Sequence, residues 1–273
     1  SKASASSAAS YISPQYSTAS SPRRRRKGLE KTMSSLLSQT CSDWEYIVVD
    51  GASSDGTVDY LRSQEQAFGG RLKWVSEPDG GIYDAMNKGL AMASGSVVGF
   101  LGGGDTFFDE YSLKAIVDEF DMARVDAVYG DLVFVRADDY TKVCRYWRGS
   151  QYRPGIFDNG WQPAHPTFFC HKVCFCDYGG FDTSLRVSAD FDLMLRFIER
   201  HHISNRYIPR TLIKMVNGGE SNGSLRNIII AHRNIYRSFK KYGYKVPPFY
   251  SLRRLLPKIL NMLGNSITGW IQH

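Results

Sequence analysis

Two carboxylates in the sequence each end a short apolar run that we predict to be a buried strand. Asp50 ends "YIVVD" and is followed by small residues that include Ser53, and Asp105 ends "VGFLGGGD". Small residues let a planar ligand lie close to the backbone, and a carboxylate accepts hydrogen bonds from a base or a ribose. A carboxylate in such a place also suits Mg²⁺ or Mn²⁺ bridged to a diphosphate. A plain turn with an aspartate that caps the next helix is the alternative for both segments.

A third segment, "SADFDLML", places Asp190 and Asp192 at the start of a strongly apolar helix. One carboxylate of the pair suits an N-terminal helix cap. The other suits a general base that takes a proton from a hydroxyl group in a cleft. The spacing alone leaves open which aspartate has which role.

These segments belong to a regular alternation of predicted strands and helices that begins near residue 28. Strands are predicted over 46–50, 72–77, 96–101 and 126–135, and helices over 29–39, 55–63, 81–93 and 112–120. Such alternation is typical of βαβ units around a mostly parallel sheet. Ligands of these sheets bind beyond the carboxyl ends of the strands, so we expect Asp50 and Asp105 to share one site.

Composition and charge narrow the class of protein. The chain has 273 residues and a formal net charge of +7, to which "RRRRK" at 23–27 contributes strongly. That charge fits an anionic partner such as a nucleotide, although a solvated basic tail fits equally well. Five cysteines, an odd number, argue against a disulfide framework and favour a reducing cytosol. The sequence shows no signal-peptide pattern and no apolar run long enough to span a bilayer, so a cytoplasmic protein, soluble or peripheral on the inner face of the plasma membrane, is expected.

Taken together, five segments of the chain resemble family-2 glycosyltransferases of the GT-A fold. They are "YIVVDGASSDGT", "SEPDGGIYDAMNKGLAMASGSVVGFLGGGD", "HPTFFCHK", "GGFDTSLRVSADFDLMLR" and "GGESN". The likeness is strongest to the bacterial enzymes of exopolysaccharide, colanic-acid and O-antigen synthesis. It implies an α/β, Rossmann-like fold with a mostly parallel sheet flanked by helices. The implied organisation is a disordered basic tail at 1–27, a catalytic domain at 28–222 and a helical C-terminal extension at 223–273.

The resemblance also implies an inverting transfer of a hexosyl or deoxyhexosyl group from a nucleoside-diphosphate sugar to a saccharide or lipid-linked acceptor, with Mn²⁺ or Mg²⁺ as cofactor. Asp105 matches the last aspartate of the family's metal motif, and His165 matches a position on the acceptor side. Asp190 is the preferred match to the catalytic base, and Asp192 is the alternative. The implied donor-binding residues are Asp50, Ser53, Tyr83, Asp84, Asn87, Lys88, Gly104 and Asp105.

Two features depart from the family pattern. Many members carry two carboxylates at the metal motif, whereas Gly104 precedes Asp105 here. The family also begins with a buried apolar strand, and the corresponding "YSTASSPRRRRKG" contains no comparable run. We therefore hypothesise that residues 1–27 are not the family's usual start and that the sheet lacks its first strand. Pairing of residues 16–20 as a poor strand is the alternative.

Those departures leave two other functions open, a catalytically impaired glycosyltransferase-like protein and a basic module that binds membranes or nucleic acid. No nucleic acid is expected as a partner, because no platform of aromatic and basic residues accompanies the arginine run. Residues 252–271 combine an apolar stripe with flanking basic residues, which fits either packing onto the catalytic domain or peripheral membrane contact. The cysteine spacing of "CHKVCFC" does not match a usual zinc site.

Overall fold

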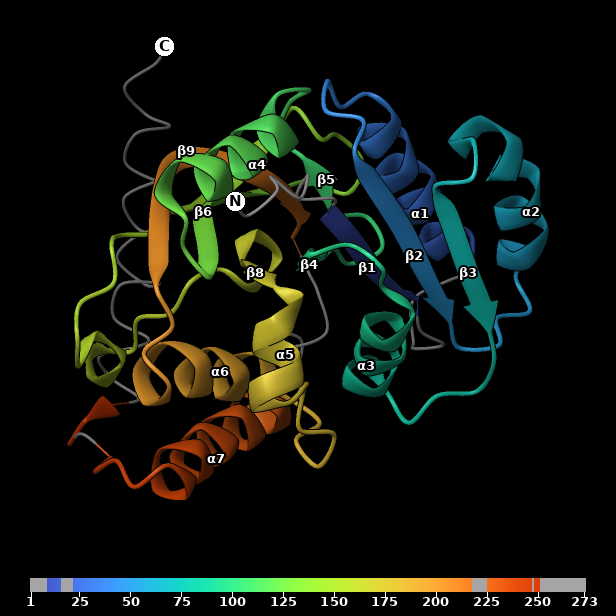
Figure 1. The fold of residues 1–273 in the computed structure, drawn as a ribbon. Coiled ribbons are helices and arrows are strands. Elements are labelled where there is room, and N and C mark those ends of the chain that lie inside the picture. The colour runs from blue at the N-terminus through green and yellow to red at the C-terminus, as the bar shows by residue number, and fades with distance from the viewer. Residues whose placement is uncertain (1–8, 16–21, 218–224, 247, 251–273) are drawn as a thin grey trace, which may run out of the picture.

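A mixed sheet of nine strands runs through the described part of the molecule, and helices cover both of its faces (Figure 1). The computed structural model describes residues 9–15, 22–217, 225–246 and 248–250. The strands are β1 (Ala9–Gln15), β2 (Trp44–Asp50), β3 (Leu72–Ser76), β4 (Val97–Phe100), β5 (Thr106–Phe107), β6 (Ala127–Val135), β7 (Val143–Trp147), β8 (Phe169–His171) and β9 (Asn205–Val216). The helices are α1 (Pro22–Leu37), α2 (Thr57–Phe68), α3 (Ile82–Met92), α4 (Ser112–Ala123), α5 (Lys172–Tyr178), α6 (Ala189–Met194) and α7 (Leu225–Lys241).

The order of strands in the sheet is β3-β2-β1-β4-β8-β6-β9-β5, and β7 pairs with β6. The first four strands of this order are parallel to one another, as the alternation of strands and helices predicts. The rest of the sheet is mixed, because β8 is antiparallel to both β4 and β6, and β5 is antiparallel to β9. The prediction of a mostly parallel sheet is therefore wrong for this half, where short connections such as that between β6 and β7 permit antiparallel pairing.

The two faces of β2 explain why the stretch Tyr46–Val49 of this strand is apolar at each position. Ile47 and Val49 belong to a core that also contains side chains of α3. Tyr46 and Val48 point to the other face, into a core shared with α1 and α2. Because successive side chains of a strand alternate between faces, a stretch covered by a helix layer on each side is apolar at successive positions.

The N-terminal segment corrects two expectations from the sequence. Residues 9–15 form β1, which pairs in parallel with β2 on one side and β4 on the other, so the sheet does contain a central first strand. The arginine run at 23–27 lies within α1 rather than in a disordered tail. Residues 9–15 thus belong to the same sheet as strands that follow residue 28, and residues 22–27 belong to a helix that continues to Leu37. The alternative strand at 16–20 lies outside the described residues.

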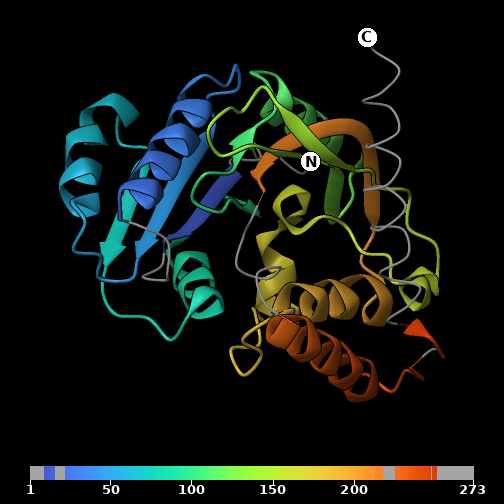
Figure 2. The same ribbon diagram turned by 180° about the vertical axis from the view of Figure 1, so that it is seen from behind.

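In the C-terminal half of the chain, α6 continues as a π-helix over Leu195–Arg200. The helix α7 packs against α6, and both views show the two side by side (Figures 1 and 2). Within the described residues, none of the helices has the length and apolar character that a membrane crossing requires. Residues 252–271, for which membrane contact was considered, lie outside the described residues.

Candidate active site

Asp50 stands at the carboxyl end of β2 with its side chain fully buried. Its Oδ2 atom accepts two hydrogen bonds, from the Ser53 backbone N–H at 2.9 Å and from the Ser76 hydroxyl at 2.6 Å. Its Oδ1 atom is buried and has no hydrogen-bond partner in the described structure. A buried oxygen with an unused lone pair is costly, and a ligand that donates a hydrogen bond to it would remove that cost.

Asp105 lies in the loop that follows β4, and two backbone N–H groups bind its carboxylate. The side chain is buried, and it accepts hydrogen bonds from the backbone N–H groups of Gly102, at 3.1 Å, and Val216. A Cβ atom on Gly102 would lie 2.9 Å from the Asp105 Oδ2 atom, so glycine is needed for the carboxylate to reach the backbone there. The loop is fixed further at Gly104, whose N–H donates to the Thr32 hydroxyl at 3.0 Å.

Whether a metal ion fits this loop depends on the side chains that could supply its ligands. Among the described residues, no group of three or more His, Cys, Asp or Glu side chains is arranged to hold a metal. Asp105 by itself fits a cation whose other ligands are phosphate oxygens and water, as Mg²⁺ accepts. Burial raises the pKa of Asp105 to about 7, and the two backbone hydrogen bonds lower it in part. A neighbouring cation would favour the charged carboxylate.

A second cluster brings together three of the predicted site residues from distant parts of the chain. Tyr83, in the first turn of α3, donates a hydrogen bond of 3.2 Å to the Oδ1 atom of Asp190, in the first turn of α6. His165 stacks on Phe100 at the end of β4, with ring centroids 5.6 Å apart, and it packs edge-on against Phe181. The His165 Nε2 atom is enclosed and has no hydrogen-bond partner in the described structure. We call Tyr83, His165 and Asp190 the acid–base cluster.

The electrostatics of the acid–base cluster define the protonation states of its two neutral members. Burial, together with the charge of Asp190, raises the pKa of Tyr83 well above its usual value, so its hydroxyl stays protonated and can donate. Burial lowers the pKa of His165, and the charge of Asp190 opposes this in part. The imidazole is therefore neutral near pH 7.

Asp192 faces away from this cluster. Its side chain is fully buried against α7, where its Oδ2 atom accepts a hydrogen bond of 2.8 Å from the Tyr242 hydroxyl. Lys241 and Arg196 approach the same oxygen at 3.8 Å and 4.0 Å. Of the two aspartates that sequence reasoning left as alternatives, Asp190 is the one beside His165 and Tyr83.

The other residues expected at the donor pocket make contacts within the protein. Asn87 clamps the backbone of Phe181, because its amide donates to the carbonyl oxygen at 2.9 Å and its Oδ1 atom accepts from the N–H at 2.8 Å. Asp84 accepts from the Gly80 N–H at 2.9 Å. Lys88 donates to the Pro78 carbonyl and pairs with Glu77 at 2.8 Å. These side chains hold the segment before α3 and the loop after α5.

Sequence reasoning missed three residues that shape the site. Ser76 ends β3 opposite Asp50 in the strand register, so a polar residue at the end of a neighbouring parallel strand was the available signal. Phe100 and Phe181 enclose His165. These two aromatic residues carry no sequence signal for a site, because buried phenylalanines are common in any core.

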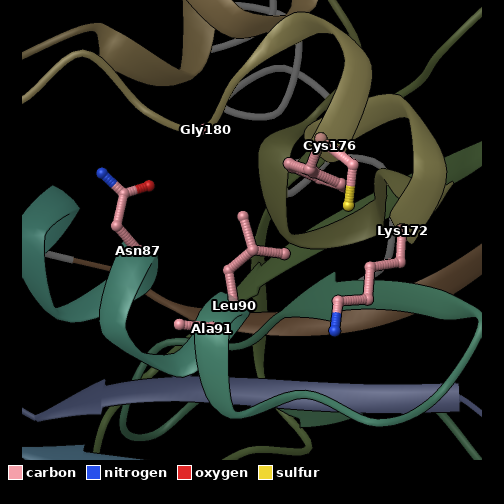
Figure 3. Close-up of a pocket in the computed structure, with 7 residues that line it drawn as sticks. Asn87, Leu90, Ala91, Lys172, Cys176 and Gly180 are labelled. Carbon is pink, nitrogen blue, oxygen red and sulfur yellow. The ribbon is translucent and has the colours of Figure 1, made fainter.

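A separate pocket of about 310 Å³ lies between the second half of α3 and α5 (Figure 3). Its lining is mainly apolar and includes Leu90, Phe175, Cys176 and Gly180. It shares Asn87 with the predicted donor residues, but the Asn87 amide is occupied by the Phe181 backbone. We therefore place the candidate site at the carboxyl ends of the strands rather than in this pocket.

The arrangement combines a buried carboxylate at a strand end, a Gly-rich loop with an acidic residue, and a carboxylate beside a neutral imidazole. Such a set can bind a polar ligand and accept a proton from it, as group-transfer enzymes require. The sequence profile of glycosyl transferase family 2 matches residues 23–178. The chain therefore belongs to glycosyl transferase family 2 and is a glycosyltransferase, as the sequence resemblance predicted.

Two relatives extend the likeness along the sequence. The PGL/p-HBAD biosynthesis glycosyltransferase of Mycobacterium bovis is 27% identical over 247 residues, which make up 89% of this chain and 91% of that protein. An uncharacterized glycosyltransferase of Mycobacterium tuberculosis is 33% identical over 179 residues, which make up 62% of this chain and 63% of that protein. The chain is thus similar to the first of these proteins over most of its length.

Two solved structures share the fold. The structure of TarS 1–349 from S. aureus in complex with UDP-GlcNAc has a TM-score of 0.66 at 16% identity, covering 90% of this chain and 72% of that one. The mannosyltransferase PcManGT from Pyrobaculum calidifontis, in complex with GDP-Man and Mn²⁺, has a TM-score of 0.62 at 21% identity, covering 91% and 69%. These similarities support the α/β fold of the GT-A type that the sequence resemblance implied.

Proposed function

We propose that the protein transfers a sugar from a nucleoside-diphosphate sugar to a hydroxyl group of a saccharide or lipid-linked saccharide, with inversion, in the synthesis of a cell-surface glycan. The observation that carries this proposal is the acid–base cluster, in which Asp190 accepts a hydrogen bond from the Tyr83 hydroxyl and its charge acts on the neutral His165. An inverting transfer needs one carboxylate to take the acceptor's proton on the face opposite the leaving group. Asp190 is the base in this proposal.

The donor side of the proposal rests on Asp50. Its enclosed Oδ1 atom lacks a hydrogen-bond donor in the described structure, and a ribose hydroxyl or a base N–H group would supply one. The names of the solved neighbours describe complexes with UDP-GlcNAc and with GDP-Man, so a nucleoside-diphosphate sugar is the donor class proposed here. The name of the mycobacterial relative places that enzyme in PGL/p-HBAD biosynthesis, which supports an acceptor that becomes part of a cell-surface glycan or glycolipid.

The chain's own residues divide the work as follows. Asp50, with Ser53 and Ser76 holding it in place, binds the nucleoside. Asp190 receives the acceptor proton, and the Tyr83 hydroxyl orients the Asp190 carboxylate. His165 is the uncharged side chain near that carboxylate. Asp105 is the residue that would hold Mn²⁺ or Mg²⁺, and such a cation would neutralise charge on the departing diphosphate. The Gly102–Gly104 turn keeps Asp105 in place for that role.

The donor site is tested with a thermal-shift panel of UDP, GDP, CMP and dTDP, each with and without Mn²⁺. A ligand that binds only the folded state raises the unfolding midpoint by mass action. We expect one nucleotide to raise the midpoint and Asp50→Asn to abolish that shift. Asp59→Asn, at an exposed aspartate of α2, is the matched control and should keep it. A nucleotide shift that survives in Asp50→Asn would overturn the assignment of Asp50.

The base is tested by comparing Asp190→Asn with Asp192→Asn in a donor and acceptor turnover assay. Removal of a general base lowers kcat by about 10²- to 10⁴-fold, and we expect that loss for Asp190→Asn with an unchanged unfolding midpoint. Asp192→Asn removes the charge of a carboxylate that lies near Lys241 and Arg196 and accepts a hydrogen bond from Tyr242, so we expect lower stability and a much smaller loss of kcat. The reverse pattern would assign the base to Asp192.

A further inference from the structure

The helix α7 presents an outward face that α6 does not cover. Asn234, Ile235, Ser238 and Phe239 are buried toward the rest of the protein. On the opposite side of the helix, five exposed residues follow one another at helical spacing, and we call them the α7 outer face: Ile229, Arg233, Tyr236, Arg237 and Lys240. Figure 1 shows α7 as the outermost layer of this half of the molecule.

The apolar part of this face is unusually exposed for large side chains. Ile229 is 67% exposed, and Tyr236 is 36% exposed. Phe249 is 76% exposed, and it directly precedes Tyr250, whose ring packs edge-on against Tyr236 with centroids 6.4 Å apart. Large apolar side chains gathered in one place on a surface mark a site of contact with another apolar phase.

The charged part of the same face is purely basic. Arg233, Arg237 and Lys240 alternate with the apolar residues, and α7 contains no Asp or Glu. Lys241, at the edge of the face, differs from these three because it pairs with Asp182 at 2.8 Å. Exposed cations beside exposed Ile and Tyr side chains suit contact with an anionic surface that also has an apolar layer.

We propose that the α7 outer face, together with Phe249, docks onto the surface of an anionic lipid bilayer. The cations would pair with acidic headgroups while Ile229, Tyr236 and Phe249 enter the boundary between headgroups and acyl chains. Charge complementarity alone would also suit a nucleic acid. A phosphate backbone, however, offers no apolar environment in which Ile229 and Phe249 could be buried. The bilayer is therefore the occupant that accounts for both halves of the face.

The test is co-sedimentation of the full chain with vesicles. We compare vesicles of phosphatidylcholine alone with vesicles containing about 30% phosphatidylglycerol, at low salt and at about 0.5 M NaCl. We expect binding to the anionic vesicles at low salt, a reduction of about 100-fold in Arg233→Gln/Arg237→Gln/Lys240→Gln, and a reduction on the order of tenfold in Ile229→Ser/Phe249→Ser.

Matched controls carry the same changes elsewhere on the surface. Arg62→Gln/Lys114→Gln/Lys142→Gln removes three charges from exposed residues, and Met122→Ser removes a side chain that is 72% exposed on α4. Both controls should bind vesicles as the unchanged protein does. Each variant must first show a cooperative melt, so that a lost fold is not counted as lost binding.

Three outcomes would overturn the proposal. The first is equal vesicle binding by the face variants and the controls. The second is binding to duplex DNA but not to vesicles, with the loss in the charge variant alone. The third is a concentration-dependent dimer that the face variants abolish while vesicles do not bind. Vesicle binding without any nucleotide-dependent shift would leave docking intact and count against the proposed function instead.

Discussion

At the scale of single residues, the position of Asp190 shows why two aspartates of the same type two places apart have different surroundings. Residues i and i+2 of a helix project about 200° apart, so α6 directs Asp190 toward Tyr83 and Asp192 toward Tyr242. The sequence indicates both carboxylates and their helix. It could not indicate which of them faces the site, because that depends on α3 and α7, whose positions come from contacts between residues far apart in the chain.

Tyr83→Phe tests whether the tyrosine hydroxyl positions the base. The hydroxyl donates a hydrogen bond of 3.2 Å to the carboxylate of Asp190, and its loss would leave that carboxylate less well positioned. We expect kcat to fall while the nucleotide shift stays unchanged. Tyr60→Phe, on α2, is the control. A kcat equal to that of the unchanged protein would show that the hydroxyl has only a packing role.

His165 makes the stability of the fold depend on pH. Burial lowers the pKa of His165 in the folded protein, whereas in the unfolded chain its pKa is about 6.5. The stability is therefore fully present above that pH, and it is lost as the pH falls through the window between the unfolded and folded pKa values, because the unfolded chain binds the proton first.

Urea unfolding at about pH 7.5 and pH 5.5 measures this effect, whose limit is about 1.4 kcal/mol per pH unit. We expect the free energy of unfolding to fall more between these pH values in the unchanged protein than in His165→Gln. The difference between the two proteins removes the contribution of His201, whose pKa burial also lowers. An equal fall in both would mean that His165 is not the group responsible.

At the scale of elements, the strands that the sequence could predict are those with an apolar run buried between two helix layers. β2 and β6 are of this kind, and their ranges were predicted closely. β1 was missed because "ASYISPQ" contains serines and a proline, which are unusual in a central strand. The antiparallel pairing of β8 with β4 could not be predicted, because the partner residues are distant in sequence.

The loop after α5 provides a prediction at this scale. A Cβ atom on Gly180 would lie 2.4 Å from the Asn87 Oδ1 atom, and Asn87 is held by two hydrogen bonds to Phe181. We expect Gly180→Ala to lower the free energy of unfolding by about 1–3 kcal/mol. It should also lower kcat, because Phe181 packs against His165.

Chemical denaturation and turnover assays on the same preparation check both effects of Gly180→Ala. Gly80→Ala is the matched control, since a Cβ atom there would meet Asp84 atoms at an ordinary distance of 3.6 Å or more. If both variants unfold at the same denaturant concentration, the clamp between Asn87 and Phe181 is not tight enough to reject a methyl group.

At the scale of the whole molecule, β1 joins two parts of the sheet. It pairs with β2 along Ala9–Gln15 and with β4 over Val97–Phe100, so β2 and β4 have no other link within the sheet order. We expect a chain that lacks residues 1–21 to lose its cooperative thermal transition, measured by circular dichroism. A variant with Ile12→Pro, which removes a backbone donor from a central strand, should weaken the transition in the same way. A sharp transition at an unchanged midpoint would show that β1 is dispensable.

The pairing of β4 with β8 also has a consequence for protein synthesis. β4 is complete once residue 100 has been made, but its antiparallel neighbour spans Phe169–His171. Throughout the interval, the emerging chain exposes one unpaired edge of β4, with Val97 and Val98 on it. Open apolar strand edges are sites of aggregation. We therefore expect the ribosome-bound chain to be most prone to aggregation between these two points of translation, and slow codons in that stretch would prolong the exposure.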